Sequence, residues 1–317
     1  MTMTGPTDSP GQDPLGQDSL GQDSLGQNSL GDDGLIGEPI GAPGVRLPNI
    51  LSLLLAKNRP IIMGVLNITP DSFSDGGQFI EPEVAFQHAK QMIEEGADVI
   101  DIGAESTRPY GGAKPVTLDE ELARLQPVLP TLVQMGVPVS IDTLKPEIAY
   151  WALGLGARIV NDVWGLQRDP NMARVVGQHG VPVVIMHNRY KAEPTISIVS
   201  DINAFFDFSL GIAEKAGISR DAIVLDPGIG FGKTPEQSME AIAKLDKFQH
   251  FGLPLLVGAS RKRFINSVSP SEPMNRIGGS IAAHVVAYIN GASIIRTHDV
   301  AETIQALRVA AALRKSL

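Results

Sequence analysis

The sequence predicts a (β/α)8 TIM barrel preceded by a disordered low-complexity tail. Short apolar runs of β character alternate with amphipathic helical patterns, and this alternation is typical of a parallel sheet built from β–α units. Eight such repeats over about 250 residues match the length of a closed eight-stranded barrel. The alternation begins after residue 46, so we predict a tail over residues 1–46 and a barrel over residues 47–317.

The tail contains a tandem repeat. Residues 11–35 form pentads that each begin with Gly and end with Leu. A period of five fits neither a helix nor a strand, and one Leu in five residues buries too little apolar area to offset chain entropy. The tail lacks the basic start and apolar block of a secretory signal, and it is too acidic for a transit peptide. We therefore expect a disordered tail on a cytoplasmic protein.

The composition excludes several classes of protein. The 317 residues contain no Cys, which excludes a disulfide framework and a thiolate zinc site. The 35 Asp and Glu residues outnumber the 26 Lys and Arg residues, and this net charge of −9 argues against a nucleic-acid surface. No apolar run is long enough to cross a membrane. We therefore predict small molecules as partners, with neither nucleic acid nor membrane.

Eight short apolar runs are the predicted strands. They cover residues 61–66, 99–102, 137–141, 158–160, 181–186, 223–225, 255–257 and 294–296. Helices are predicted at residues 82–95, 118–135, 146–153, 170–179, 200–216, 235–244, 276–289 and 300–313, after a short lead-in helix at 48–56. Pro in the first turn of several helices and Gly after others are typical start and stop signals.

An open doubly wound sheet is the alternative fold. Its Gly-rich dinucleotide turn follows the first strand. Here Gly64 lies inside the first run, and no G-x-G-x-x-G motif follows it. The barrel is therefore the favoured fold.

Nearly every predicted strand is followed by polar or charged residues. In a barrel the carboxyl ends of all strands meet at one mouth, where the chemistry lies. A lone Asp there is more often a helix N-cap, and an Asn-Asp pair a turn, but a polar group at strand after strand indicates a site. The residues concerned include Asn67, Ser106, Thr107, Arg108, Asp142, Asn161, Asp162, His187, Asn188, Asp226, Ser260, Lys262, Arg296 and His298.

One group of these residues is suited to phosphate. Arg and Lys supply positive charge and donors, and Arg offers a bidentate fork. Asn67 adds an amide oxygen for Mg²⁺, which takes few protein ligands and shares phosphate oxygens. The group consists of Arg108, Lys262, Arg296 and His298, with hydroxyls from Ser106 and Thr107.

A second group is suited to a flat heterocycle. Asp142, Asn161 and Asp226 offer acceptors and a donor to a ring that is rich in N–H and C=O edges. The residues alone therefore predict a pocket with anionic phosphates on one side and a planar base on the other.

The Gly-rich run from Gly228 to Thr234 superficially matches a phosphate-binding P-loop. That motif requires a Gly where this chain has Pro227, so the match fails. We expect the glycines to let the backbone approach a ligand closely. Lys233 is either solvated at the start of the next helix or part of the site.

The order and spacing of these motifs resemble those of the dihydropteroate synthase family, over about residues 58–313. The motifs are Asn67–Gly77, Glu105–Pro109, Ser140–Thr143, Asn161–Asp162, Leu225–Lys233, Ser260–Lys262 and Arg296–Val300. The resemblance implies a TIM barrel, commonly dimeric, that joins 6-hydroxymethyl-7,8-dihydropterin diphosphate to 4-aminobenzoate. The products are 7,8-dihydropteroate, which leads to folate, and pyrophosphate, and sulfonamides compete with the aminobenzoate.

The resemblance also assigns the leaving group and the metal. Asn67 is expected to contact Mg²⁺, and Arg108, Arg296 and His298 to hold the diphosphate.

The pterin and the aminobenzoate are assigned in the same way. Asp142, Asn161, Asp226 and Lys262 are expected to bind the pterin, with Met186 packed on its ring. The residues expected at the aminobenzoate are Thr107, Pro109, Phe231 and Lys262, with the backbone of Arg263. We expect Asp142 and Lys262 to be the catalytic residues, with Asp142 stabilising positive charge on the pterin, and assign no general base.

The chain departs from the family pattern at Ala104, Tyr110 and Arg263, where Gly, Gly and Ser are common. Two pterin-binding alternatives therefore stay open, an inactive paralogue and a methyltetrahydrofolate:corrinoid methyltransferase. The second has no diphosphate to hold, so Arg108, Arg296 and His298 argue against it. Another phosphate-binding barrel, such as a lyase, needs a catalytic Lys or Glu inside a strand, and the sequence offers no strong candidate.

Overall fold

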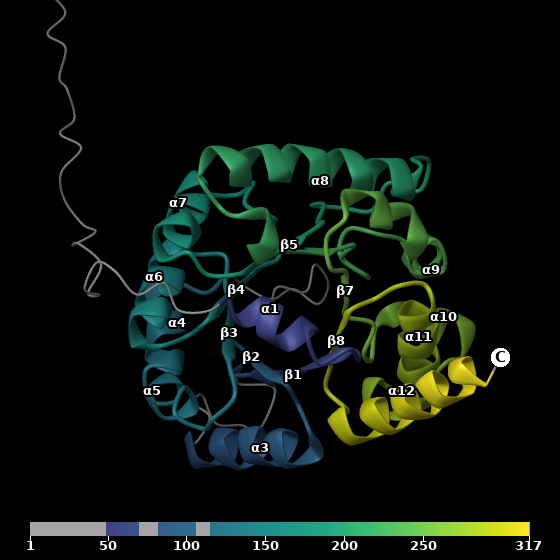
Figure 1. The fold of residues 1–317 in the computed structure, drawn as a ribbon, viewed down its shortest axis with the longest axis horizontal. Coiled ribbons are helices and arrows are strands. Elements are labelled where there is room, and N and C mark those ends of the chain that lie inside the picture. Colours follow the sequence, from purple (N-terminus) through teal and green to yellow (C-terminus); the bar gives the residue numbers. More distant parts are fainter. Residues whose placement is uncertain (1–48, 70–81, 106–114, 317) are drawn as a thin grey trace, which may run out of the picture. The chain divides into compact units, whose positions relative to one another are not determined.

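Eight parallel strands form a barrel surrounded by helices, as the sequence predicted (Figure 1). The computed structural model describes residues 49–69, 82–105 and 115–316. The predicted tail therefore lies outside the described residues. The strand order is β6-β5-β4-β3-β2-β1-β8-β7, and a parallel bridge between Leu225 and Leu255 joins the two ends of this order.

The strands end in register at the mouth of the barrel. Asn67 pairs with Gly103, Gly103 with Asp142, and Asp142 with Asn161, so these residues form one row across neighbouring strands. The bounds are β1 Ile61–Asn67, β2 Val99–Gly103, β3 Val139–Asp142, β4 Ile159–Asp162, β5 Val183–Met186, β6 Ile223–Asp226, β7 Leu256–Val257 and β8 Ile294–Thr297. Several strands thus run one or two residues further than predicted, because the polar residue at the end belongs to the ladder.

The helices follow the predicted pattern with two differences. The helix predicted at residues 118–135 is broken into α4 and α5, because Pro127 lies between them and Pro130 lies in the first turn of α5. The short helix α10 was not predicted. The helices are α1 Ile50–Leu55, α3 Pro82–Glu95, α4 Leu118–Leu125, α5 Leu129–Leu132, α6 Pro146–Leu155, α7 Pro170–His179, α8 Ile198–Lys215, α9 Pro235–Ala243, α10 Arg263–Val268, α11 Ile277–Ile289 and α12 Val300–Lys315.

The two larger apolar cores among the described residues lie on opposite sides of the strands. The larger core lies between the strands and the surrounding helices. The smaller core fills the inside of the barrel, where Leu51 and Leu54 of α1 pack with strand residues such as Met63 and Val184. Figure 1 shows α1 lying across the centre of the strand ring. This helix covers one end of the barrel and leaves the carboxyl ends of the strands for the site. None of the described helices is long and apolar enough to cross a membrane.

A buried histidine joins the last two helices. His284 of α11 is fully buried, and its Nδ1 lies 3.4 Å from the hydroxyl of Thr303 on α12. Its Nε2 is buried and has no hydrogen-bond partner in the part of the chain that the structure describes. Burial lowers the pKa of His284 to about 4 from its ordinary value of 6.5. The folded protein therefore keeps this ring neutral at a pH where the unfolded chain protonates it.

This burial predicts acid sensitivity of the fold. As the pH falls from 6.5 to 4, His284 becomes protonated in the unfolded state and stays neutral in the folded state. This difference lowers the free energy of unfolding by about 3 kcal/mol across the range. Urea unfolding at a series of pH values measures the slope, and His284→Gln should reduce it. His250→Gln, at an exposed histidine, is the matched control and should leave the slope unchanged. A slope that is equal in all three proteins would contradict this assignment.

Candidate active site

Arg296 lies at the centre of the mouth and joins three strands. From β8, its Nε donates to Oδ2 of Asp101 on β2 at 2.6 Å, and its Nη2 donates to Oδ2 of Asp142 on β3 at 2.8 Å. Asp101 Oδ2 also accepts from the side-chain amide of Asn161 on β4, at 3.1 Å. The guanidinium compensates two buried carboxylates, and its Nη1 takes part in neither ion pair. That nitrogen can therefore donate to an anionic ligand.

The carboxylate of Asp142 is buried, and this environment disfavours its charged form. Burial raises its pKa to about 7, Arg296 acts in the opposite direction, and the neighbouring Asp101 adds to the rise. Its Oδ1 is buried and, among the described residues, has no hydrogen-bond partner. Oδ1 of Asp101 is in the same condition. Unpaired buried acceptors are costly, so the mouth is prepared for a ligand that brings N–H donors.

Asp226 and Asp162 are fixed by backbone donors. Burial raises the pKa of each to about 6, and backbone N–H groups oppose the rise. Oδ1 of Asp226 accepts from the N–H of Gly228 at 2.7 Å. Asp162 accepts from the N–H groups of Trp164 and Leu166, at 2.9 and 2.7 Å. Asp162 therefore closes a tight turn after β4, whereas Asp226 keeps one oxygen outside this hydrogen bond.

An apolar wall completes the mouth. Met186 at the end of β5 packs with Val163 and Phe231, and Trp164 borders the same cluster. The ammonium of Lys262 lies 4.0 Å from the centre of the Phe231 ring. A cation over an aromatic face is favourable, and the pair places a positive charge beside a flat apolar surface.

The loop after β7 is tied to the loop after β8. Arg261 has a positive φ of 58° and pairs with Asp299, with Nη2 2.6 Å from Oδ1. The hydroxyl of Ser260 lies 3.0 Å from Nδ1 of His298. These contacts hold Lys262 and His298, both half-buried, at the same rim.

The Gly-rich loop packs against its own chain at two of its glycines, and the expected approach of its backbone to a ligand stays a prediction. A Cβ on Gly228 would lie 1.9 Å from the carbonyl oxygen of His187, and one on Gly232 would lie 2.4 Å from Arg189. The glycines at these two positions therefore let the loop lie against the end of β5. Lys233, which could have been solvated, is 3% exposed.

The structure brings most of the predicted site residues together. The side chains of Asp142, Asn161, Asp226, Met186, Phe231, Lys262, Arg296 and His298 come from strand ends or loops at the carboxyl end of the barrel, and Asn67 ends β1 beside them. Thr107 and Arg108 lie outside the described residues. Sequence reasoning missed Asp101, which is fully buried inside β2. The available signal was a charged residue in an otherwise apolar strand.

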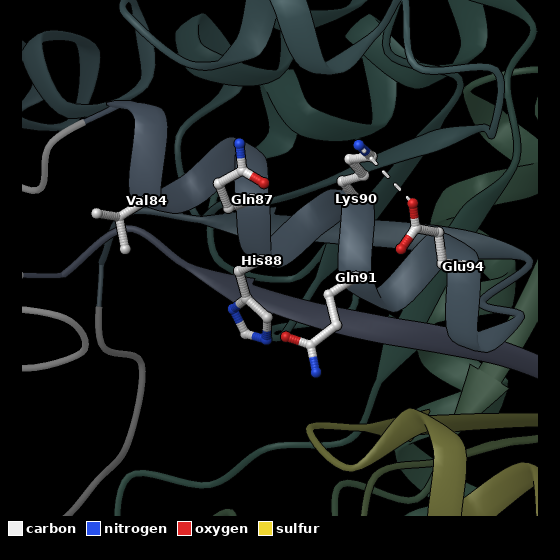
Figure 2. Close-up of a pocket in the computed structure, with 6 residues that line it drawn as sticks. All are labelled: Val84, Gln87, His88, Lys90, Gln91 and Glu94. Carbon is white, nitrogen blue, oxygen red and sulfur yellow. Dashed lines mark ion pairs between the residues drawn. The ribbon is translucent and has the colours of Figure 1, made fainter.

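A hollow elsewhere on the surface contains none of these residues. It is lined by α3 residues, including His88, Gln91 and Glu94, and Lys90 pairs with Glu94 at 3.8 Å (Figure 2). The predicted site residues that the structure describes therefore lie at the mouth and not on this helix face.

Comparison with known proteins agrees with the geometry. The model of the family described as "Pterin binding enzyme" matches residues 63–298. The dihydropteroate synthase of Bacillus subtilis (strain 168) is 44% identical over 250 residues, which cover 78% of this chain and 87% of that protein. The dihydropteroate synthase of Escherichia coli (strain K12) is 42% identical over 259 residues, covering 80% and 91%.

Solved structures agree as well. The Clostridium difficile dihydropteroate synthase, determined in the presence of pteroic acid, is 47% identical with a TM-score of 0.77, over 80% of this chain and 97% of that chain. The Xanthomonas albilineans enzyme with 4-aminobenzoic acid is 43% identical with a TM-score of 0.77, over 81% and 94%. The chain therefore belongs to the pterin-binding enzyme family and, within it, to the dihydropteroate synthases.

Proposed function

We propose that this protein condenses 6-hydroxymethyl-7,8-dihydropterin diphosphate with 4-aminobenzoate to give 7,8-dihydropteroate and pyrophosphate. One observation carries the proposal: Arg296 is held between Asp101 and Asp142, each of which keeps a buried oxygen unpartnered among the described residues. This arrangement is suited to a planar ring with N–H edges that carries an anionic group. Solved relatives with 4-aminobenzoic acid and with 7,8-dihydropteroate support the same reading.

The pterin ring is bound by groups on rigid strand ends. Asp142, Asn161 and Asp226 receive and donate hydrogen bonds at its polar edges, and Met186 packs on its face. Because these residues belong to strand ladders, little conformational entropy is lost in positioning them when the substrate binds.

The leaving group is stabilised by cations. Arg296 and His298, with Arg108 from outside the described residues, hold the diphosphate while the bond between the pterin methylene carbon and the diphosphate oxygen breaks. The bonding electrons leave with the pyrophosphate, and Asp142 stabilises the positive charge that develops on the pterin. The amine of 4-aminobenzoate donates its lone pair to this carbon, and its surplus proton passes to the pyrophosphate or to water. No general base is required.

Phe231 and Lys262 are suited to the second substrate. The aromatic ring of Phe231 offers a flat surface for the benzoate, and the Lys262 ammonium above it can attract a carboxylate. Thr107, Pro109 and the backbone of Arg263 are assigned to this site by resemblance.

Mg²⁺ is the proposed cofactor, with Asn67 as its protein ligand. No group of three or more His, Asp or Glu side chains that could hold a metal occurs among the described residues. The half-buried Asn67 at the end of β1 fits a cation that takes one protein oxygen and obtains the rest from the diphosphate and water. Mg²⁺ would supply further charge stabilisation to the leaving group.

A homodimer and a cytoplasmic location are also proposed, on the resemblance to the family. Exposed apolar side chains on α11 and α12, among them Ile289 and Leu313, offer a surface for a second copy. Light scattering after gel filtration measures the mass in solution, and cell fractionation measures the location.

The proposed reaction predicts a selective effect of Asp142→Asn. With both substrates and saturating Mg²⁺, the wild-type protein should release pyrophosphate in step with dihydropteroate. Asp142→Asn should lower kcat by about a hundredfold, because it removes the charge that stabilises the developing pterin cation. Lys262→Ala should also abolish most of the activity. Tight binding of the pterin diphosphate without either product, in the wild-type protein, would instead identify an inactive pterin-binding paralogue.

The raised pKa of Asp142 predicts a pH dependence. Its anion is the active form, so kcat/KM for the pterin diphosphate should fall as the pH drops through about 7. The substrate titrates as well, but its titration is common to the wild type and Asp142→Asn. The ratio of their kcat/KM values therefore reports Asp142 and should fall towards acid. A ratio that is constant from pH 5.5 to pH 8.5 would contradict an ionised Asp142 as the active form.

The Mg²⁺ proposal predicts a shift in the metal requirement. Asn67→Ala should raise the Mg²⁺ concentration needed for half-maximal activity by about tenfold, because one inner ligand is lost. Equilibrium dialysis of Mg²⁺ with the pterin diphosphate bound gives a second readout. An unchanged Mg²⁺ dependence in both assays would remove Asn67 from the metal site.

A further inference from the structure

Lys233 is a fully engaged buried cation beneath the Gly-rich loop. Its Nζ lies 2.6 Å from Nδ1 of His187, 2.9 Å from the carbonyl oxygen of Gly228 and 3.1 Å from that of Phe231. A lysine ammonium has three protons, and each of these three atoms can accept one of them. Burial lowers the pKa of Lys233 to about 7, and the charge of Asp226 opposes this change. Its contacts with two backbone carbonyl groups suit the side chain to holding the backbone in place.

The network continues to the surface through His187. Because the lysine donates to Nδ1, the ring carries its proton on Nε2, which donates to Oδ2 of Asp201 at 2.9 Å. Asp201 lies on α8 and also accepts from Arg189, at 2.7 Å. Burial lowers the pKa of His187 to about 4, which agrees with a neutral ring between the lysine and the carboxylate. Two elements distant in sequence thus fix the position of the ammonium.

The two carbonyl groups that Lys233 holds lie on either side of the turn that presents Phe231. The N–H of Phe231 donates to the carbonyl of Gly228 at 3.1 Å, so the lysine and the turn share an acceptor. On the far side, the hydroxyl of Thr234 caps α9 by accepting from the N–H of Gln237, at 3.2 Å. The loop is therefore anchored at both ends, and the Phe231 ring is held beneath Lys262.

We propose that Lys233 is a positioning residue for the second substrate: it holds the Phe231 ring against Lys262 without touching either substrate. The proposal rests on the proposed function, because the aminobenzoate is the ligand assigned to Phe231. Asp142 and Asn161 are held by strands that Lys233 does not touch, and of the proposed pterin groups Asp226 alone meets the loop, through the N–H of Gly228. Binding of the pterin diphosphate should therefore depend much less on Lys233 than binding of the aminobenzoate does.

The test compares the two substrates in Lys233→Met, which keeps the length of the side chain and removes the charge and its donors. We expect KM for 4-aminobenzoate to rise about tenfold, the scale of one lost charge-assisted hydrogen bond. The dissociation constant of the pterin diphosphate, measured by calorimetry, should stay within about twofold of wild type. Lys244→Met, at a half-exposed lysine just after α9, is the matched control and should change neither constant.

Two further variants separate positioning from stability. His187→Gln keeps an acceptor for the lysine and a donor for Asp201, so it should retain a KM near that of wild type, whereas His187→Leu should raise KM selectively. Phe231→Leu should raise the same KM, and Lys233→Met should add little to it, because residues that act through one group are not additive. His187→Leu also keeps the test decisive if Lys233→Met fails to fold.

Several results would overturn the proposal. They are a lower melting temperature with unchanged KM values, an equal loss of affinity for both substrates, or fully additive effects of Lys233→Met and Phe231→Leu. A wild-type protein that makes no dihydropteroate would instead refute the proposed function, and this result is read before any variant is compared.

Discussion

The pairing of the half-buried Arg296 with two buried carboxylates is the interaction on which the mouth of the barrel depends. It joins β8 to β2 and β3 through Asp101 and Asp142. Two carboxylates so close together and so deeply buried would otherwise repel each other. The arginine compensates them only in part, because burial still raises the pKa of Asp142 to about 7. The site therefore holds charge that a bound cationic or N–H-rich ring can neutralise further.

The residues proposed to bind the two substrates lie on different parts of the barrel, on rigid strand ends for the pterin and on loops for the aminobenzoate. The groups proposed to bind the pterin lie on strand ends whose register is fixed by the ladder, as in the pairing of Asp142 with Asn161. The groups proposed to bind the aminobenzoate, Phe231 and Lys262, lie on loops. A loop obtains comparable precision only through added contacts, which Lys233 supplies beneath Phe231 and the Arg261–Asp299 pair supplies beside Lys262.

Much of this arrangement could be predicted from the sequence, because it follows from local patterns. Apolar runs between helical patterns predicted the barrel, and polar residues after the runs predicted the mouth. The sequence did not identify Asp101 as a site residue, because it lies inside an apolar run. Its ion-pair partner, Arg296, comes from β8, far along the chain. The break between α4 and α5 was available in principle from Pro127 and Pro130. The tail and residues 106–114 lie outside the described residues, so predictions for them stay predictions.

Two lysines show why part of the site could not be predicted from the sequence. Lys233 and Lys262 both follow glycine-containing strand ends, and the sequence left open whether Lys233 is solvated or part of the site. Their roles differ because of burial: Lys233 is 3% exposed with three acceptors around its ammonium, whereas Lys262 is half-buried over an aromatic face. The acceptors of Lys233 include His187, which is placed there only when β5 and β6 pair. Lys233, which is bound to its own chain, is suited to organising the site. Lys262, which lies at the rim, is able to bind an anionic substrate.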